Sequence, residues 1–248
     1  MTNIIMSGIN GRMGKAVEEL CKNDTSVEIV AGIDINLGVP HSFPTVSNPF
    51  ELDIKADVII DFSHHSCAEM LCNYAIETGT PIVFATTGYT DEELELINKT
   101  TEKVAVFTSA NMSLGVNVII NLAKQAAKIL ENFDIEIIEK HHNQKLDAPS
   151  GTALMIANGI KEIRDNSKYV YDRSQVRQKR EKEEIGIHAI RGGTIVGEHD
   201  VIFAGHNEVV TISHSAQSRE VFASGAVSAA KFIAEKGAGM YHMEDLIG

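Results

Sequence analysis

The sequence lacks tryptophan and contains only three cysteines, Cys21, Cys67 and Cys72. Their odd number and the absence of CxxC spacing argue against a disulfide framework and against a zinc site. No segment approaches the ~18 consecutive apolar residues of a membrane-spanning helix, and the apolar run Ile4–Met6 is too short for the core of a signal peptide. We therefore expect a cytoplasmic protein with reduced thiols and no membrane partner.

Positive charge is also scarce, because 22 lysines and arginines stand against 34 aspartates and glutamates. The resulting net charge of −12 would repel a polyanion, so we expect no nucleic-acid partner. Hydrophobic residues make up 44% of the 248 residues, which is enough for one large or two smaller globular domains.

The first part of the chain alternates short apolar segments with amphipathic ones. Near-continuous apolar strands separated by helices are typical of a parallel sheet that is covered on both faces. The expected strands are Asn3–Met6, Val27–Ile33, Val58–Asp61, Pro81–Ala85 and Val104–Thr108, and the expected helices are Met13–Lys22, Cys67–Glu77 (ended by Gly79) and Glu92–Lys99. This order predicts a doubly wound, Rossmann-type α/β domain.

The pattern changes after about residue 113. A helix is expected from Ser113, which can cap it, to Leu130, and a second capped helix over Ser150–Ile163. Segments with strand character are Asp134–Glu139, Ile185–Ile190, Thr194–Phe203 and Glu208–Ala216. We therefore predict a second, α+β domain over residues 113–218 with a mixed or antiparallel sheet. Residues 1–112 and 219–248, the latter with a helix over Glu220–Lys236, would form the dinucleotide-binding domain.

A charged segment, Asp172–Glu184, interrupts the second domain and contains no large aliphatic residue except Val176. This composition favours a solvated loop or a mobile lid. Alternatively, its basic side chains would steer an anionic substrate. These side chains are Arg173, Arg177, Lys179, Arg180 and Lys182.

A glycine-rich segment, Gly8-Ile9-Asn10-Gly11-Arg12-Met13-Gly14, lies between the first expected strand and the first expected helix. The pyrophosphate of a dinucleotide needs backbone N–H groups at close range and a helix N-terminus, and glycines permit that approach. The spacing is GxxGxxG rather than the commoner GxGxxG, so a plain tight turn remains the alternative.

Asp34 ends the next expected strand, about twenty residues after the glycine loop. A carboxylate at this place can accept hydrogen bonds from both hydroxyls of the adenosine ribose, and it would repel a 2′-phosphate. Ile35 supplies no compensating charge, although Arg12 would partly offset the repulsion. NADH is therefore favoured, with NADPH still open, and a solvated strand end is the alternative for Asp34.

The most unusual segment is 139–152, Glu-Lys-His-His-Asn-Gln-Lys-Leu-Asp-Ala-Pro-Ser-Gly-Thr. It places cationic donors at His141, His142 and Lys145 beside a helix start at Pro149–Thr152, whose free N–H groups and dipole form an anion site. This combination suits a substrate with carboxylates and a group that gives a proton near neutral pH. Metal binding and a structural surface loop are the alternatives. Adjacent histidines rarely point at one ion, so no metal is predicted.

Several segments together resemble the dihydrodipicolinate reductase family, also called 4-hydroxy-tetrahydrodipicolinate reductase, over essentially the whole chain. They are the glycine loop, Asp61-Phe62-Ser63, Thr86-Thr87-Gly88, Ser-Ala-Asn-Met-Ser-Leu-Gly-Val-Asn at 109–117, the segment 139–152, and Ile-Arg-Gly-Gly-Thr-Ile-Val-Gly-Glu-His at 190–199. The segment 139–152 is highly specific to that family, whereas the glycine loop alone is not.

The resemblance implies a reductase of diaminopimelate and lysine biosynthesis that passes a hydride from NADH or NADPH to a cyclic dicarboxylate. It implies proton transfer by His141 and Lys145, substrate binding by His142, Ser150, Gly151 and Thr152, and a homotetramer assembled through the second domain. The implied cofactor contacts are Gly8, Ile9, Asn10, Gly11, Arg12, Met13, Asp34, Ala85, Thr86, Thr87, Ser109, Ala110, Asn111, Met112, Arg219 and Phe222.

Two positions depart from the family's usual pattern. Ala85 stands where the turn before Gly88 usually starts with glycine, and Ile35 stands where some members carry an arginine that grips a 2′-phosphate. Two other functions would also explain the glycine loop. One is another two-domain dehydrogenase acting on amino acids, such as a relative of aspartate or homoserine dehydrogenase. The other is a non-catalytic nucleotide sensor whose cationic segment binds a regulatory anion.

Overall fold

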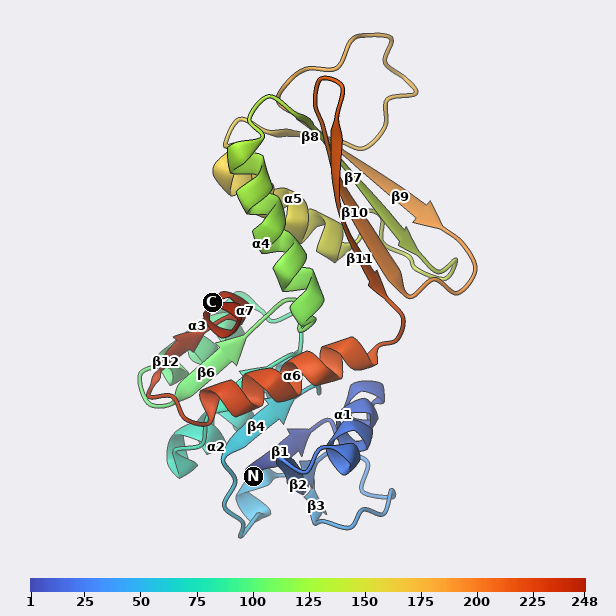
Figure 1. Cartoon of the computed structure of the whole chain (residues 1–248). Helices are drawn as coiled ribbons and strands as arrows, with labels where there is room; N and C mark the ends of the chain where they lie inside the picture. The colour runs from blue at the N-terminus through green and yellow to red at the C-terminus, as the bar shows by residue number, and fades with distance from the viewer. The chain divides into compact units, whose positions relative to one another are not determined.

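The computed structural model describes all residues from 1 to 248, and they form two compact units. Unit 1 contains Met1–Leu114 and Arg219–Gly248, and unit 2 contains Gly115–Ser218. Figure 1 shows the elements of both units. None of the helices combines the length and hydrophobicity that crossing a bilayer requires.

Unit 1 contains a seven-stranded sheet in which every neighbouring pair of strands is parallel. The strand order is β12-β6-β5-β4-β1-β2-β3. The strands are β1 (Thr2–Ser7), β2 (Val27–Ile33), β3 (Thr45–Val46), β4 (Val58–Asp61), β5 (Ile82–Phe84), β6 (Ala105–Thr108) and β12 (Gly239–Tyr241). The predicted Rossmann-type sheet is confirmed, whereas β3 and β12 were not predicted because two or three residues are too few to show a period.

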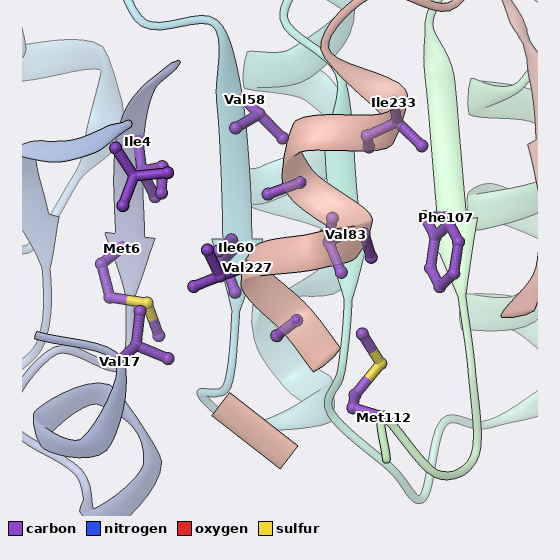
Figure 2. Packing of buried hydrophobic residues seen from close by; sticks show 14 of the residues in the cluster. Ile4, Met6, Val17, Val58, Ile60, Val83, Phe107, Met112, Val227 and Ile233 are labelled. Atoms are coloured by element: carbon purple, nitrogen blue, oxygen red, sulfur yellow. The ribbon is translucent and has the colours of Figure 1, made fainter. Parts of the chain in front are cut away.

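Helices cover both faces of this sheet. One face packs against α1 (Arg12–Asn23), α6 (Glu220–Ile233) and α7 (Met243–Ile247), and the other packs against α2 (Ala68–Thr78) and α3 (Asp91–Thr100). Successive side chains of each strand point to opposite faces and enter different cores, so the strands are apolar along their whole length. Figure 2 shows the first core, in which Val227 and Ile233 of α6 lie against strand residues such as Val83.

Unit 2 contains a mixed five-stranded sheet with the order β11-β10-β7-β9-β8. The strand β10 is antiparallel to β7 and β11, whereas β9 is parallel to β7 and β8. The strands are β7 (Asp134–His141), β8 (Lys168–Val170), β9 (Glu184–Arg191), β10 (Gly197–Ala204) and β11 (Val209–Ala216). The predicted second α+β domain with a mixed sheet is therefore also confirmed.

One face of the unit 2 sheet packs against α4 (Leu114–Ile129) and α5 (Gly151–Ile163). Residues that point to the other face, such as Ile138 and Ile202, are only half-buried. Local signals set the helix ends as predicted. The Ser150 hydroxyl caps α5 by accepting the N–H of Ala153, and α2 ends at Gly79 with a left-handed φ of 68°.

The charged segment before β9 has no helix, and acidic groups of unit 2 hold two of its arginines. Arg180 pairs with Asp134 at 2.8 Å and with Glu136 at 3.2 Å, and Arg173 pairs with Glu184. These ion pairs neutralise both guanidinium groups. The structure therefore argues against a steering role for Arg173 and Arg180.

Candidate functional site

The glycine loop joins β1 to α1 and leaves no room for side chains at two positions. A Cβ at Gly8, where φ is 78°, would lie 2.6 Å from the carbonyl oxygen of Phe62, and a Cβ at Gly14 would lie 2.2 Å from the carbonyl oxygen of Gly8. The loop therefore lies directly against the end of β4. The first N–H groups of α1 have no partner within the helix, so this cradle fits a pyrophosphate.

The loop borders a pocket of about 640 Å³ at the carboxyl ends of β1, β2 and β4. From β1 the chain continues to β2 and β3 on one side, and it then crosses to β4, β5 and β6 on the other side. Doubly wound sheets bind their ligands at the point where the strand order reverses in this way. The predicted residues Gly8, Asn10, Gly11 and Asp34 line this pocket. Other lining residues were not predicted, because they belong to no motif. They are Asn36, Ser47, His64 and Ser66 in the segments after strand ends, and Met70 in α2.

Asp34 is tied to the glycine loop. One carboxylate oxygen accepts the N–H of Asn10 and the other accepts the N–H of Asn36, each at 2.9 Å. The Asn10 side chain donates to the carbonyl oxygen of Asn36 at 2.7 Å, and its own oxygen lies 2.9 Å from Nε2 of His41. Asn10, at a position where glycine is common, thus fastens the end of β2 to the loop and fixes the Asp34 carboxylate at the pocket.

The other predicted cofactor residues line two further pockets in unit 1. The first, of about 300 Å³, is lined by Met13, Ala85, Ser109, Ala110, Asn111, Met112 and Phe222. The second, of about 360 Å³, is lined by Thr86, Thr87, Ser109 and Ala110. Phe62 lines both the 300 Å³ pocket and the pocket beside Asp34, so the predicted residues form a band along one edge of the sheet.

Three predicted cofactor residues line none of these pockets. The side chain of Ile9 is fully buried in the core beside α1, and its N–H points at the carbonyl oxygen of Ile33 at 3.4 Å. Its side chain therefore packs the loop onto the sheet. Arg12 and Arg219 are exposed at the starts of α1 and α6.

A buried carboxyl group, that of Asp61 at the end of β4, organises the turn after β5. It accepts the hydroxyls of Ser63 at 2.5 Å, Thr86 at 2.7 Å and Tyr89 at 3.3 Å. Burial raises the pKa of Asp61, and the surrounding donors oppose that rise. The group holds Thr86 at its pocket, although the sequence marked Asp61 only as part of a family motif.

In unit 2, the end of β7 brings His141 next to a fully buried carboxylate, Glu139. Nδ1 of His141 lies 2.7 Å from one Glu139 oxygen, and the guanidinium group of Arg191 donates to both oxygens at 2.7 Å. Burial by itself raises the pKa of Glu139, but the hydrogen bonds from Arg191, His141 and the Ser150 N–H outweigh it and hold that pKa below its ordinary value.

The start of α5 lies beside this histidine. The Ser150 hydroxyl is buried and lies 3.0 Å from Nε2 of His199, whose ring meets that of His141 at a centroid distance of 5.3 Å. Gly151 is exposed, and no atom lies within 4 Å of where its Cβ would be, so the first turn of α5 opens to solvent there.

Lys145 and His142 lie in the turn that follows β7. The Lys145 ammonium pairs with Asp147 at 2.8 Å, which lowers the pKa of the Asp147 carboxyl, and the Lys145 N–H donates to the carbonyl oxygen of His142. The structure thus gathers the predicted residues around the end of β7 and the start of α5. Glu139, Arg191 and His199 were not predicted as members of this cluster. Arg191 and His199 reach it through the pairing of β9 and β10 with β7, which the sequence does not reveal.

His199 predicts a pH dependence of stability. Burial, then the neighbouring His141 charge, lowers the pKa of His199 from 6.5 to about 4. Between these values the unfolded chain binds a proton that the folded chain does not, so the free energy of unfolding falls as the pH falls. We expect this group to contribute a loss of about 2 kcal/mol between pH 7 and pH 5.

Urea unfolding of the wild type and of His199→Gln at both pH values measures this contribution. The variant should lose less stability than the wild type on acidification. Equal losses in the two proteins would mean that His199 titrates alike in the folded and unfolded states.

Both units match models of one protein family. The model described as "Dihydrodipicolinate reductase, N-terminus" matches residues 2–112, and the model described as "Dihydrodipicolinate reductase, C-terminus" matches residues 115–247. The 4-hydroxy-tetrahydrodipicolinate reductase of Caldanaerobacter subterraneus subsp. tengcongensis is 54% identical over 100% of this chain and 98% of its own length. That of Clostridium novyi is 49% identical over 100% and 98%, respectively.

A solved structure is similar over nearly the same range. The dipicolinate-bound dihydrodipicolinate reductase from Paenisporosarcina sp. TG-14 has a TM-score of 0.83 and 27% identity, and the match covers 98% of this chain and 97% of that one. The likeness therefore extends through both units rather than through the dinucleotide-type fold alone.

Proposed function

The chain belongs to the dihydrodipicolinate reductase family, and from that premise we propose that it reduces 4-hydroxy-tetrahydrodipicolinate to tetrahydrodipicolinate with NAD(P)H, in diaminopimelate and lysine biosynthesis. The observation that carries this proposal is the joint presence of a glycine-loop pocket in unit 1 and a buried His141–Glu139 pair beside a helix start in unit 2. A dehydrogenase of another class would need only the first, and a nucleotide sensor would need an anion site in unit 2 but no buried His141–Glu139 pair.

We assign the proton transfers to His141 and Lys145. When bound in unit 1, the nicotinamide supplies the hydride. Loss of the 4-hydroxyl group as water first gives a conjugated, imine-containing ring. Hydride addition to that ring leaves negative charge on it, so a nearby acid is needed to supply the proton that neutralises it. In its imidazolium form, His141 is held through Nδ1 and donates the proton of its other nitrogen, and Lys145 is a second donor on the following turn.

The start of α5 is proposed to hold a carboxylate of the substrate. The N–H groups of Gly151 and Thr152 belong to the first turn, where the helix dipole favours an anion, and His142 adds a donor nearby. Ser150 contributes through its backbone position, because its hydroxyl already caps α5 and contacts His199. The dipicolinate bound to the Paenisporosarcina relative is a cyclic dicarboxylate of the expected kind.

For the cofactor we propose a preference for NADH over NADPH. The Asp34 carboxylate is fixed at the pocket beside the glycine loop, and the neighbouring Ile35 is 93% exposed and uncharged. Asp34→Ala should therefore weaken NADH binding relative to NADPH binding, measured as the ratio of the two dissociation constants from cofactor fluorescence. Asp53→Ala, a surface carboxylate outside the pocket, is the control. An unchanged ratio in Asp34→Ala would mean that this carboxylate does not contact the ribose.

We further propose a homotetramer assembled through unit 2. The sheet face opposite α4 and α5 carries half-buried isoleucines, Ile138 and Ile202, beside the ion pairs of Lys140 with Glu198 and Asp200. A mixed apolar and paired-charge surface of this kind suits an interface between copies. Light scattering coupled to size exclusion measures the mass, and a monomer would contradict the proposal.

The activity is tested by following NADH oxidation after freshly condensing aspartate semialdehyde with pyruvate. Turnover that requires both the condensed substrate and the cofactor is the expected result. Bound cofactor without turnover would favour the nucleotide sensor, and turnover of free amino acids instead would favour another dehydrogenase.

A further inference from the structure

Glu139 is shared between the two parts of the unit 2 cluster. One oxygen receives Nδ1 of His141 and a guanidinium N–H of Arg191, each at 2.7 Å. The other receives the second guanidinium N–H at 2.7 Å and the backbone N–H of Ser150 at 3.0 Å. The carboxylate has no solvent exposure, so four hydrogen bonds from three residues take the place of water.

These hydrogen bonds settle which nitrogen of His141 carries the proton in the neutral ring. The ionised Glu139 can only accept, so the hydrogen must lie on Nδ1. Nε2 is then the nitrogen with a lone pair, and no protein group hydrogen-bonds to it. A Cβ at Gly197, on β10, would lie 3.2 Å from Nε2, so this glycine leaves room beside the exchanging nitrogen.

We infer that Glu139, clamped by Arg191, is a positioning residue for the reduction. Its carboxylate keeps His141 in the Nδ1–H tautomer and also accepts the Ser150 N–H. One side chain therefore fixes the position of both the proton-transfer group and the carboxylate-binding start of α5. The inference rests on the proposed function for its kinetic consequence. The tautomer of His141 and the shared contact of Glu139 with His141 and Ser150 follow from the hydrogen bonds alone.

Arg191 has a separate part in this arrangement. Its Nη2 also donates to the carbonyl oxygen of Asp147 at 2.6 Å, which ties Glu139 to the loop that carries Lys145. On the other side of His141, His199 stays neutral near physiological pH because burial lowers its pKa to about 4. The imidazolium form of His141 is therefore stabilised by the anionic Glu139, and His199 adds no second positive charge beside it.

Glu139→Gln separates positioning from packing because it keeps the shape and loses the charge. One end of the amide becomes a donor, so it must face either the Ser150 N–H or Nδ1 of His141. The first leaves a buried N–H unpaired, and the second reverses the tautomer. Arg191→Lys is the second variant, since it keeps a positive charge but cannot make the two-pronged contact.

The experiment measures the tautomer of His141 by 15N NMR of the imidazole and, on the same proteins, kcat, KM and NADH affinity. We expect the Nδ1–H tautomer in the wild type and a mixture of the two tautomers in Glu139→Gln, since neither orientation of the amide satisfies both the Ser150 N–H and Nδ1–H of His141. The kcat should fall about 10- to 100-fold and the substrate KM should rise, while NADH binding stays unchanged. Arg191→Lys should change the same quantities less, and it replaces Glu139→Gln if the latter does not fold.

Glu136→Gln is the matched control. Glu136 lies on the same strand but on the opposite sheet face, where it contacts His188 at 2.8 Å and Arg180 at 3.2 Å. Its replacement should leave the His141 tautomer and kcat unaltered. An Nε2–H tautomer in the wild type, or wild-type kcat in folded Glu139→Gln, would overturn the inference. A wild type with the expected tautomer but no turnover would instead reject the proposed function.

Discussion

Replacement of His141 or of Lys145 by alanine is expected to lower kcat by about 100-fold or more, because each removal deletes a group that we propose exchanges a proton with the substrate. His141 is 9% exposed and held by Glu139, so its loss also leaves a buried carboxylate without one of its donors. NADH affinity should survive in both variants, since neither side chain belongs to unit 1. Steady-state kinetics with freshly condensed substrate and the fluorescence of bound NADH provide the two measurements.

Lys128→Ala is the control for Lys145→Ala. Lys128 is exposed on α4 in unit 2, on the side of the sheet opposite the proposed interface. Its removal takes away the same charge from the same unit and should leave kcat close to that of the wild type. Near-normal turnover in both His141→Ala and Lys145→Ala would reject the assigned proton transfers.

Gly225→Ala should destabilise unit 1 by more than about 3 kcal/mol, because the added methyl group meets backbone rather than a movable side chain. A Cβ at Gly225, in α6, would lie 1.6 Å from the carbonyl oxygen of Met112. Either α6 or the segment 109–112 must move, and that segment lines two of the pockets. Thermal and urea unfolding measure the loss, and NADH binding should weaken with it.

Gly237→Ala is the comparison for this steric argument. No atom lies within 4 Å of the Cβ that it would add, and its φ is not in the left-handed region. The substitution should be neutral or slightly stabilising, since alanine restricts the unfolded chain. Equal stability of Gly225→Ala and the wild type would show that α6 does not approach Met112 as closely as described.

The elements with a long apolar period were predictable, and the shortest ones were not. The alternation of apolar strands and helices in residues 1–112 specifies a parallel sheet, because each strand buries both faces. β8, β3 and β12 consist of two or three residues, and they are strands only because a longer neighbour supplies their hydrogen-bond partners. Accordingly, no element was predicted after Lys236, where the structure has the edge strand β12 and the helix α7.

In the unit 2 site, too, the residues that lie close together in the sequence were predictable and the distant ones were not. His141, Lys145 and the start of α5 were predicted as site residues because fourteen consecutive residues, 139–152, carry them. No role was predicted for Arg191 or His199, which lie some 50 residues further along the chain. The sheet register brings them in, since Arg191 pairs with His141 across β9, and His199 pairs with Glu139 across β10.

The glycine loop was predictable from residues that are neighbours in the chain. Its GxxGxxG spacing between a strand and a helix specified a close turn suited to a dinucleotide, since only residues without a Cβ allow that approach. Tertiary structure alone decided how Asn10 fastens Asp34 to the loop, which oxygen of Glu139 receives which donor, and why Gly225 must be glycine. Each of these contacts joins groups that are distant in the sequence, and local residue propensities do not predict such contacts because they form only when the chain packs.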